Sequence, residues 1–246
     1  MFLTDKNTIV LNEVDSTNNY AKQLIADKAV EGTVVLAHYQ KRGKGQEGNF
    51  WESEANKNLL FSLILYPGFL DAGKQFFISK IVSLALVEVL KKEIKEVHIK
   101  WPNDIYVGNK KIAGILIENT IKGSWLDSTI IGIGLNLNQE CFKSDAPNPV
   151  SLKQLTGKEY LVQVVLTEFF NCFNLLMDEL MNGNFEMINK AYMAQLFRQK
   201  QWSLFRKDGN EFVARIVGIG EFGQLQLQKK SGEISEFLFK EVEFVI

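Results

Sequence analysis

Apolar residues recur along the first half of the chain with two different spacings, and each spacing predicts a different element. Spacings of three and four predict helices over 15–28 and 75–94, the first capped by Asp15 or Ser16. Short apolar runs rich in β-branched residues predict strands instead. These strands cover 8–14, 32–38, 58–66, 97–101, 104–108, 110–119 and 128–138. The run 58–66 lacks polar alternation, which predicts a strand buried on both faces.

The pattern changes after Arg198. Before it, helical spacing predicts two further helices, at about 161–181 and 185–197. After it, short alternating runs separated by charged or glycine turns are typical of a small β-barrel. These runs are 201–205, 211–220, 224–228, 233–239 and 242–246. We therefore predict two domains, 1–198 and 199–246. The first is a mixed β-sheet with helices on one side, so the fold class is α+β.

The composition excludes several classes of protein. A chain of 246 residues fits one large domain or a medium domain with a small one. Apolar residues make up 46%, including 18 Phe, which allows a sizeable core, and the formal net charge of −1 gives no general attraction for polyanions. Apolar runs are too short for a bilayer, and the first residues lack a signal-peptide pattern. We expect no membrane partner and a cytoplasmic location.

Several residue types that often carry chemistry give a structural interpretation here. Cys141 and Cys172 are far apart in the chain, which predicts two buried free thiols rather than a disulfide. The segment 218–223 matches G-x-G-x-x-G, yet a two-residue alternation follows where dinucleotide binding needs a helix, so a hairpin turn is predicted. His38 and His98 lack metal-ligand spacing and are predicted to be strand residues with local hydrogen bonds.

A long loop at 40–51 combines positive charge with glycine. Lys41, Arg42 and Lys44 are interspersed with glycines, which allow the backbone to close tightly on a ligand. The cations suit a phosphate or a carboxylate. A solvated mobile loop explains the same pattern, so the loop by itself leaves both interpretations open.

Polar side chains stand at the ends of strands that look buried. Pro102 ends one strand and presents Asn103 and Asp104 at the rim of the sheet, while Asn136 ends another. A carboxylate and an amide oxygen are natural ligands for Mg²⁺. The glycines at 132 and 134 would let a ligand lie against the backbone. Lys111 alone would be a solvent-facing lysine, but together these groups favour nucleotide chemistry.

Five segments carry a resemblance to a known family. They read DSTN, AHYQKRGKGQEGNFW, KWPND, KIAGILIE and GIGLNLN, and they occupy 15–18, 37–51, 100–104, 111–118 and 132–138. In this order and spacing the chain resembles the biotin–protein ligases over nearly its full length. The resemblance implies a catalytic domain like that of class II synthetases and biotin–lipoate ligases, followed by an SH3-like module.

The resemblance also implies a reaction and a set of site residues. Biotin and ATP would give biotinyl-AMP, which would then acylate a lysine of a biotin carboxyl carrier protein domain. The positions matching the biotin site are Ser16, Thr17, Asn18, Gln40, Gly43, Lys44, Gly45, Gln46, Lys111 and Gly114. Those matching the ATP site are Lys44, Gln46, Asn49, Trp51, Lys100, Asn103, Asp104 and Asn136. Lys111 and Lys44 would be catalytic, and Asp104 and Asn136 would hold Mg²⁺.

Some features depart from the family pattern or leave alternatives. Gln46 and Asn49 stand where arginine is common in some members, and only 14 residues precede DSTN, too few for the helix-turn-helix domain of the repressor type. A lipoate or octanoate ligase of the same fold is the nearest alternative. A nucleic-acid binder is disfavoured, because seven Lys/Arg and seven Asp/Glu balance from Gln199 onward. A homodimer remains an alternative to a monomer.

Overall fold

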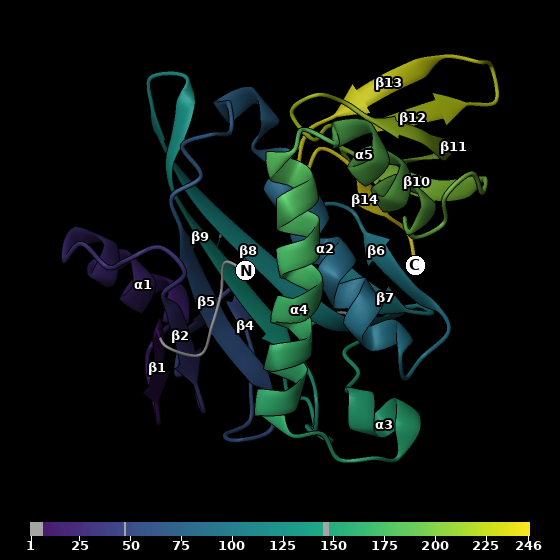
Figure 1. Ribbon diagram of the computed structural model, residues 1–246. Helices are drawn as coiled ribbons and strands as arrows, with labels where there is room; N and C mark the ends of the chain where they lie inside the picture. Colours follow the sequence, from purple (N-terminus) through teal and green to yellow (C-terminus); the bar gives the residue numbers. More distant parts are fainter. Residues whose placement is uncertain (1–6, 47, 145–147) are drawn as a thin grey trace.

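The computed structural model describes residues 7–46, 48–144 and 148–246, and its main feature is a seven-stranded sheet (Figure 1). The strand order is β1-β2-β5-β9-β8-β7-β6. The bounds are β1 (Thr8–Leu11), β2 (Val34–Ala37), β5 (Leu59–Leu65), β6 (Val97–Lys100), β7 (Asp104–Val107), β8 (Lys110–Lys122) and β9 (Trp125–Leu135). Only β1 and β2 pair in parallel, and the other neighbours are antiparallel. The predicted mixed sheet is confirmed.

Helices cover both faces of this sheet rather than one. They are α1 (Thr17–Ala26), α2 (Phe76–Lys91), α3 (Leu152–Thr156), α4 (Val162–Met181) and α5 (Phe185–Ala194), with a 3-10 turn η2 (Ala72–Lys74). The helices α2 and α4 bury the main core against one face. On the opposite face, Ala21 of α1 packs against Val35, Ile64 and Ile130 of β2, β5 and β9. The prediction of helices on one side is therefore wrong for α1.

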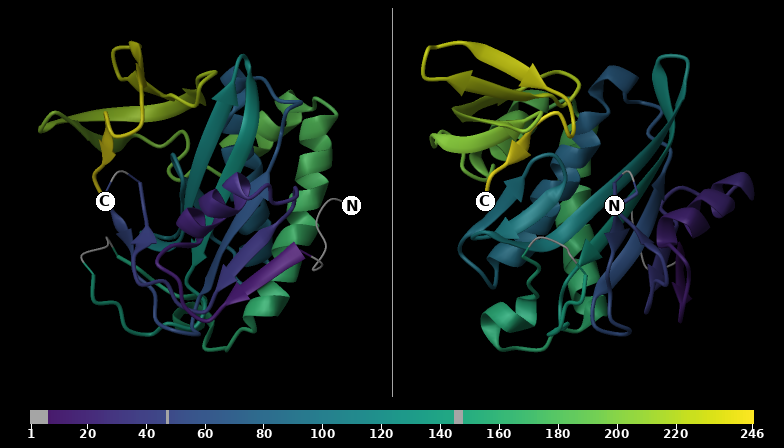
Figure 2. Two further views of the ribbon diagram at one scale, coloured as in Figure 1. Left: turned by 90° about the vertical axis from the view of Figure 1, so that its left-hand side faces the viewer. Right: turned by 180° about the vertical axis from the view of Figure 1, so that it is seen from behind.

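The position of α1 follows from strand alternation. Successive residues of a strand point to opposite faces, so Val35 and Ile64 face α1 while their chain neighbours face α2 and α4. As predicted, β5 is buried along its whole length. The helix covers its face over β2, β5 and part of β9, and Figure 2 shows that side from two further directions. The part of this face over β8 is left for other groups.

A second, five-stranded antiparallel sheet follows α5. Its order is β13-β12-β11-β10-β14, with β10 (Ser203–Lys207), β11 (Asn210–Ile219), β12 (Leu225–Lys229), β13 (Ile234–Phe237) and β14 (Glu243–Phe244). The predicted small β-module is thus present, while the division at 198/199 stays a prediction. The segment 218–223 leads from β11 into a turn before β12, as expected from its alternation.

A buried contact joins the two sheets. Trp101 donates its indole N–H to the carbonyl of Gly223, with an N–O distance of 2.8 Å. The centres of the Trp101 and Phe239 rings lie 5.3 Å apart, and the centre of the Phe76 ring in α2 lies 6.0 Å from that of Phe239. Gly223 has a φ of +94°, and a Cβ there would stand 2.6 Å from the Phe76 ring. Only glycine fits this turn without displacing the ring.

Several local predictions need correction. The loop that contains 40–51 holds a small hairpin, β3 (Gly43–Lys44) paired with β4 (Phe50–Trp51). Both cysteines are free thiols, but Cys141 is exposed and Cys172 only partly buried. His98 lies in β6 as expected, yet its Nδ1 is buried and finds no hydrogen-bond partner in the part of the chain that the structure describes.

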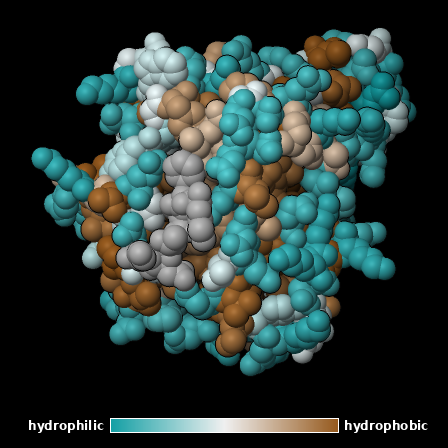
Figure 3. Space-filling model, in the orientation of Figure 1, coloured by the Kyte–Doolittle hydropathy of each residue, from teal (hydrophilic) through white to brown (hydrophobic). Residues whose placement is uncertain are grey.

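The outer surface is mainly hydrophilic on one face of the molecule. Hydrophilic side chains predominate on the face shown in Figure 3, and apolar ones gather in separate patches. Leu161, Val164 and Leu175, at the start and on the outside of α4, are among the large apolar side chains left exposed. Within the described ranges, none of the helices has the length and apolar character needed to cross a membrane.

Replacing Gly223 by alanine should loosen the contact between the two sheets. An alanine held at this positive φ costs about 1–3 kcal/mol of unfolding free energy. Displacing the Phe76 ring costs about 1–3 kcal/mol more. Gly232→Ala is the matched control, because Gly232 has a φ of +93° with no neighbour within 4 Å of the added Cβ. Chemical denaturation should show the larger loss of unfolding free energy for Gly223→Ala, and equal losses would contradict the proposed packing.

Candidate functional site

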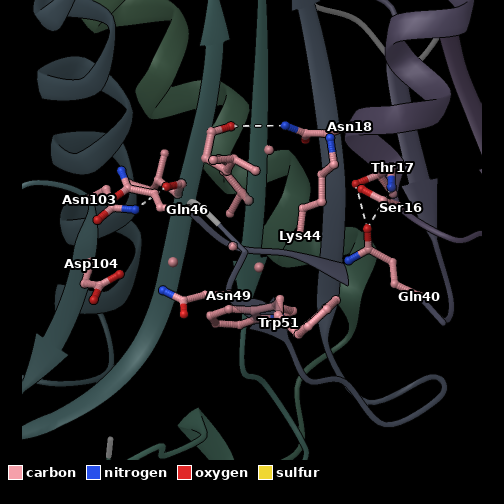
Figure 4. Close-up of a pocket in the computed structure, with 18 of the residues that line it drawn as sticks. Ser16, Thr17, Asn18, Gln40, Lys44, Gln46, Asn49, Trp51, Asn103 and Asp104 are labelled. Atoms are coloured by element: carbon pink, nitrogen blue, oxygen red, sulfur yellow. Dashed lines mark hydrogen bonds between the residues drawn. The ribbon is translucent and has the colours of Figure 1, made fainter. Parts of the chain in front are cut away.

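A pocket of about 260 Å³ lies on the face of the large sheet that carries α1 (Figure 4). Its lining brings together most of the residues singled out in the sequence. These are Ser16, Thr17, Asn18, Gln40, Lys44, Gly45, Gln46, Asn49, Trp51, Asn103, Asp104, Lys111 and Gly114. Gly43, Lys100 and Asn136 do not line this pocket. Segments far apart in the sequence therefore meet at one place.

Strand pairing places the floor residues side by side. Across the sheet, Ser62 of β5 pairs with Gly132 of β9, which pairs with Leu116 of β8. One step along the pocket, Gly134 pairs with Gly114, and Gly114 pairs with Asp104 of β7. Residues two apart in a strand share a face, so both rows open on the pocket.

Glycines give this floor its depth. A Cβ at Gly134 would stand 2.3 Å from Cε2 of Trp51, and one at Gly114 would stand 2.8 Å from the same ring. A Cβ at Gly132 would stand 2.1 Å from Oδ1 of Asn18. Two protein side chains thus lie against the bare backbone where the sequence predicted a ligand would lie. Trp51 and Asn18 form walls of the pocket at these points.

A buried chain of hydrogen bonds forms one end of the pocket. The Gln40 Oε1 accepts from the Thr17 backbone N–H at 2.7 Å and lies 3.1 Å from the Thr17 hydroxyl. The Ser62 hydroxyl lies 2.8 Å from Thr17 Oγ1 and 2.6 Å from Asn18 Oδ1. Ser62 was missed, although a lone serine inside the apolar run of β5 is a readable signal. These contacts fix the orientation of the side chains that face the pocket.

The start of α1 contributes a hydroxyl that the helix does not use. Ser16 occupies the N-cap position, but its side chain makes no capping hydrogen bond. It is almost fully buried and lines the pocket beside Thr17. Since N-cap serines normally bond a backbone N–H of the first turn, the hydroxyl of Ser16 is available to a ligand.

Glu118 connects this polar end to the glycine-rich hairpin. Its Oε2 accepts from Nδ2 of Asn18 at 2.7 Å, and its Oε1 lies 3.6 Å from the Lys44 ammonium. Both members of this ion pair are more than a third exposed, so the pair is weak and easily exchanged. Glu118 was also missed by sequence reasoning, because its contact with Lys44 joins two segments that are far apart in the chain.

An ion pair stands in the wall formed by β7 and β8. The Lys111 ammonium lies 2.7 Å from Asp104 Oδ1 and 5.7 Å from the centre of the Trp51 ring. Lys100 lies behind this pair, over the rings of Tyr106 and Phe244. Burial lowers the pKa of the Lys100 ammonium, and the charge of Asp104 partly opposes this. Lys100 therefore adds positive charge behind the wall rather than in it.

The two amides predicted at strand ends have different settings. The Asn103 side-chain amide donates to the Ile115 carbonyl, and the Ile115 N–H donates to the Asn103 backbone carbonyl. These two bonds extend the β7–β8 contact by one residue before the start of β7. Asn136 donates to the carbonyl of Val150 at 3.2 Å, while its Oδ1 is buried and has no hydrogen-bond partner among the described residues. It lines a smaller neighbouring cavity that also contacts Trp51 and Lys111.

The second sheet supplies a further lysine to the pocket. Lys240, on the loop between β13 and β14, lines it together with Lys44 and Lys111. Sequence reasoning missed Lys240 because nothing in its local pattern distinguishes it from other turn lysines. Among the residues that the structure describes, the pocket thus combines a neutral hydrogen-bonding end with three lysines and one carboxylate. It suits an elongated ligand with a polar uncharged head and acidic groups beyond it.

Comparison with known families agrees with this arrangement. A model described as the biotin/lipoate A/B protein ligase family matches residues 10–136. That span begins in β1 and ends at Asn136, so it contains both rows of the pocket floor.

Individual relatives and solved structures are similar over most of the chain. The bifunctional ligase/repressor BirA of Bacillus subtilis is 29% identical over 225 residues, which cover 89% of this chain and 68% of that protein. The biotin–[acetyl-CoA-carboxylase] ligase of Paracoccus denitrificans is 28% identical, and the match covers 91% of this chain and 95% of that protein. The structure of Aquifex aeolicus biotin protein ligase in complex with biotin and ATP has a TM-score of 0.82 at 25% identity, with 98% and 100% covered.

Removing the Ser62 hydroxyl should destabilise the buried polar chain. Ser62→Ala leaves Thr17 and Asn18 short of a partner, at a cost of about 1–3 kcal/mol. Ser83 is equally buried, but its hydroxyl has no partner among the described residues, so Ser83→Ala is the matched control. Denaturant unfolding should show a clear loss of unfolding free energy for Ser62→Ala and little change in it for Ser83→Ala. The reverse order would contradict the assigned network.

Proposed function

Because the chain belongs to the biotin/lipoate A/B protein ligase family, we propose that it is a biotin–protein ligase. It activates biotin with ATP to biotinyl-5′-AMP and transfers the biotin to a lysine of a biotin carboxyl carrier protein domain. The observation that supports this best is the single pocket lined by nearly all the residues that match the family motifs. The relatives named for biotin ligation and the structure with biotin and ATP point the same way.

The neutral end of the pocket suits the ureido ring of biotin. That ring offers one carbonyl and two N–H groups, and the end formed by Ser16, Thr17 and Gln40 offers hydroxyls and an amide. Asn18 and Ser62 hold these groups in fixed orientations. Preorganised neutral donors and acceptors favour a ring that matches them and disfavour one lacking hydrogen-bonding groups. This supports biotin over lipoate or octanoate.

The charged region suits the first chemical step. An oxygen of the biotin carboxylate attacks the α-phosphorus of ATP, a new C–O–P linkage forms, and pyrophosphate leaves. Both reactants are anionic, so cations must be fixed where they meet. Lys111 is held in place by Asp104, and Lys44 is held by a weak pair from which it can turn toward a phosphate. In this proposal these two lysines carry the catalytic charge.

The second step requires no enzyme nucleophile. A neutral lysine amine of the carrier attacks the biotinyl carbonyl carbon, the amide forms, and AMP leaves. The hairpin β3–β4 carries Gly43, Gly45 and Gln46 beside the pocket, where it can shield the adenylate from water. Gly43 pairs with Trp51 within this hairpin, and a Cβ there would stand 2.5 Å from the Trp51 carbonyl oxygen.

The ATP companion ion and the cellular setting complete the proposal. Asp104 and the orphaned amide oxygen of Asn136 fit the oxygen ligands that Mg²⁺ prefers, and they would hold it. A bound Mg²⁺ would neutralise phosphate charge. Within the described ranges no three His, Cys, Asp or Glu side chains cluster, so phosphates would supply other ligands. We also propose a carboxylase carrier as partner, a cytoplasmic location and no nucleic-acid partner. A homodimer remains a prediction.

Pyrophosphate release tests the assignment directly. With ATP and Mg²⁺, biotin should drive release, while lipoate and octanoate should not. Release driven by lipoate instead would favour the other branch of the same family. No release with any of the three acids would end the proposal.

Lys111→Ala should abolish most adenylation while the protein stays folded. Losing a fixed charge at the reacting phosphate costs about 10²–10³ in rate. Lys111→Arg should recover only part of it, because the planar guanidinium does not replace the point charge paired with Asp104. The measurement is biotin-dependent pyrophosphate release, with the unfolding midpoint as the control for folding. Normal release by the alanine variant would contradict the role.

Gln46→Arg should slow the dissociation of biotinyl-AMP. Gln46 lines the pocket at a position where the family resemblance implies arginine in some members, so we infer that charge holds the intermediate less here than in those members, and neutral hydrogen bonds hold it more. A charge-assisted bond adds about 1.5–3 kcal/mol, which is on the order of ten- to a hundredfold in rate. Gln163→Arg adds the same charge on the exposed side of α4 and serves as the control. Equal dissociation rates for Gln46→Arg and wild type would rule the idea out.

A further inference from the structure

A second cavity, of about 170 Å³, adjoins the pocket from the other side of β8. The two share three lining residues, Gln46, Asn103 and Ile115. The second cavity lies on the α2 face, between Ser79 of α2, Ile117 of β8 and the turns of the C-terminal sheet. The reaction as described above leaves this cavity without a role.

The two cavities connect where β7 begins. β7 begins at Asp104 and pairs with β8 only as far as Gly114. Past that point β8 continues to Lys122 with β9 on its other side. The Asn103–Ile115 backbone contact is the last link before the edge of β8 becomes free of β7. A chain reaching around this edge arrives beside Asp104 and Lys111.

The lining of the second cavity has a different chemistry from the pocket. Among the described residues its walls contain no ionisable side chain, only amides, a hydroxyl, aliphatic groups and the rings of Phe76, Phe222 and Phe239. The pocket, in contrast, is lined by Lys44, Lys111 and Lys240. Burying an unpaired charge is costly, so a polyphosphate belongs in the pocket and not here.

Its size also points to part of a larger molecule. At about 170 Å³ this cavity is smaller than the pocket of about 260 Å³ proposed for biotin and the nucleotide. A single unbranched side chain with a polar tip fits both the volume and the mixture of apolar walls and amides. Phe222 and Phe239, 55% and 43% exposed, stand at the cavity on turns of the C-terminal sheet and offer apolar surface to a protein.

We propose that this cavity is the channel through which the acceptor lysine of the carrier domain reaches biotinyl-AMP, an inference that rests on the proposed function. The four methylene groups of the lysine lie between the rings, and its nitrogen passes Asn103 into the pocket. The carrier covers the mouth of the channel and contacts Phe222 and Phe239. The nucleotide and biotin stay on the opposite side of β8.

The channel also assists the amine chemically. A lysine has a pKa of about 10.4 in water, and uncharged walls favour its neutral form. The ammonium gives one proton to solvent, and the neutral nitrogen forms the new C–N bond with the biotinyl carbonyl carbon. The bond from that carbon to the phosphate oxygen breaks, and AMP leaves with the electron pair. A second proton then leaves the nitrogen to solvent, which yields the amide.

Ser79→Phe tests the channel, because Ser79 is half-buried on α2 and lines only this cavity of the two. The added ring should block the channel. Biotin-dependent pyrophosphate release should stay within about twofold of wild type, whereas transfer to a purified carrier domain should fall at least about tenfold. Hydroxylamine, small enough to enter from the pocket, should still capture biotin as the hydroxamate. Ser231→Phe, in an exposed turn of the C-terminal sheet, is the control.

The outcomes separate this inference from the proposed function. Unchanged transfer by Ser79→Phe would overturn the channel, and so would a raised KM for ATP, since the nucleotide would then occupy the cavity. If the wild-type protein releases no pyrophosphate with biotin, the function itself fails. Phe222→Ala is a second variant that tests the channel if Ser79→Phe does not fold. It should raise the KM for the carrier about three- to tenfold and leave adenylation unchanged, and an unchanged KM would count against the channel.

Discussion

Bare backbone on β8 and β9 is the constraint on which the site depends. At Gly114, Gly132 and Gly134 any side chain would collide with Trp51 or Asn18. Those two side chains form walls of the pocket, and each is tied to another functional segment. Asn18 begins the chain of contacts with Ser62 and Glu118, and Trp51 belongs to the hairpin that carries Lys44. The glycines therefore set both the depth of the pocket and the position of the hairpin beside it.

The two faces of the large sheet have different roles. One face carries the main apolar core, and the other carries the pocket. The face under α2 and α4 buries the main apolar core, and that core extends into the C-terminal sheet through Phe205, Leu225 and Leu227. The opposite face carries α1, the glycine floor and the polar groups of the pocket. Because the core does not depend on the pocket side chains, that face can hold polar groups poorly suited to packing. The unpartnered Oδ1 of Asn136 and Nε1 of Trp51 are examples.

The C-terminal sheet belongs to the site as well as to the core. The Trp101–Gly223 bond and the Phe76–Phe239 contact fix its turns against α2. From that position Lys240 reaches the pocket and Phe222 reaches the adjoining cavity. A small module with balanced charge thus gains a role through its position rather than its composition. Its fixed place beside β8 supports both the ATP end of the proposed reaction and the approach of a protein substrate.

The sequence by itself determined the main strands and helices and most of the candidate residues, but not α3 or the β3–β4 hairpin. Strands, helices and the turn at 218–223 follow from local spacing, which depends on residues close together in the chain. Motif matches likewise identified Lys111, Asp104 and Gln40 before their proximity was known. These signals are local, so they can be recognised without the fold.

Only the tertiary structure decided which groups meet. Strand order places Ser62 beside Gly132, and the packing of the β3–β4 hairpin brings Lys44 to Glu118. Neither contact leaves a trace in the local sequence. The same register put α1 on the face away from α2, where the sequence had predicted helices on one side. Contacts between segments distant in the chain depend on how the sheet closes, and the hydrophobic pattern of each strand does not encode its neighbours.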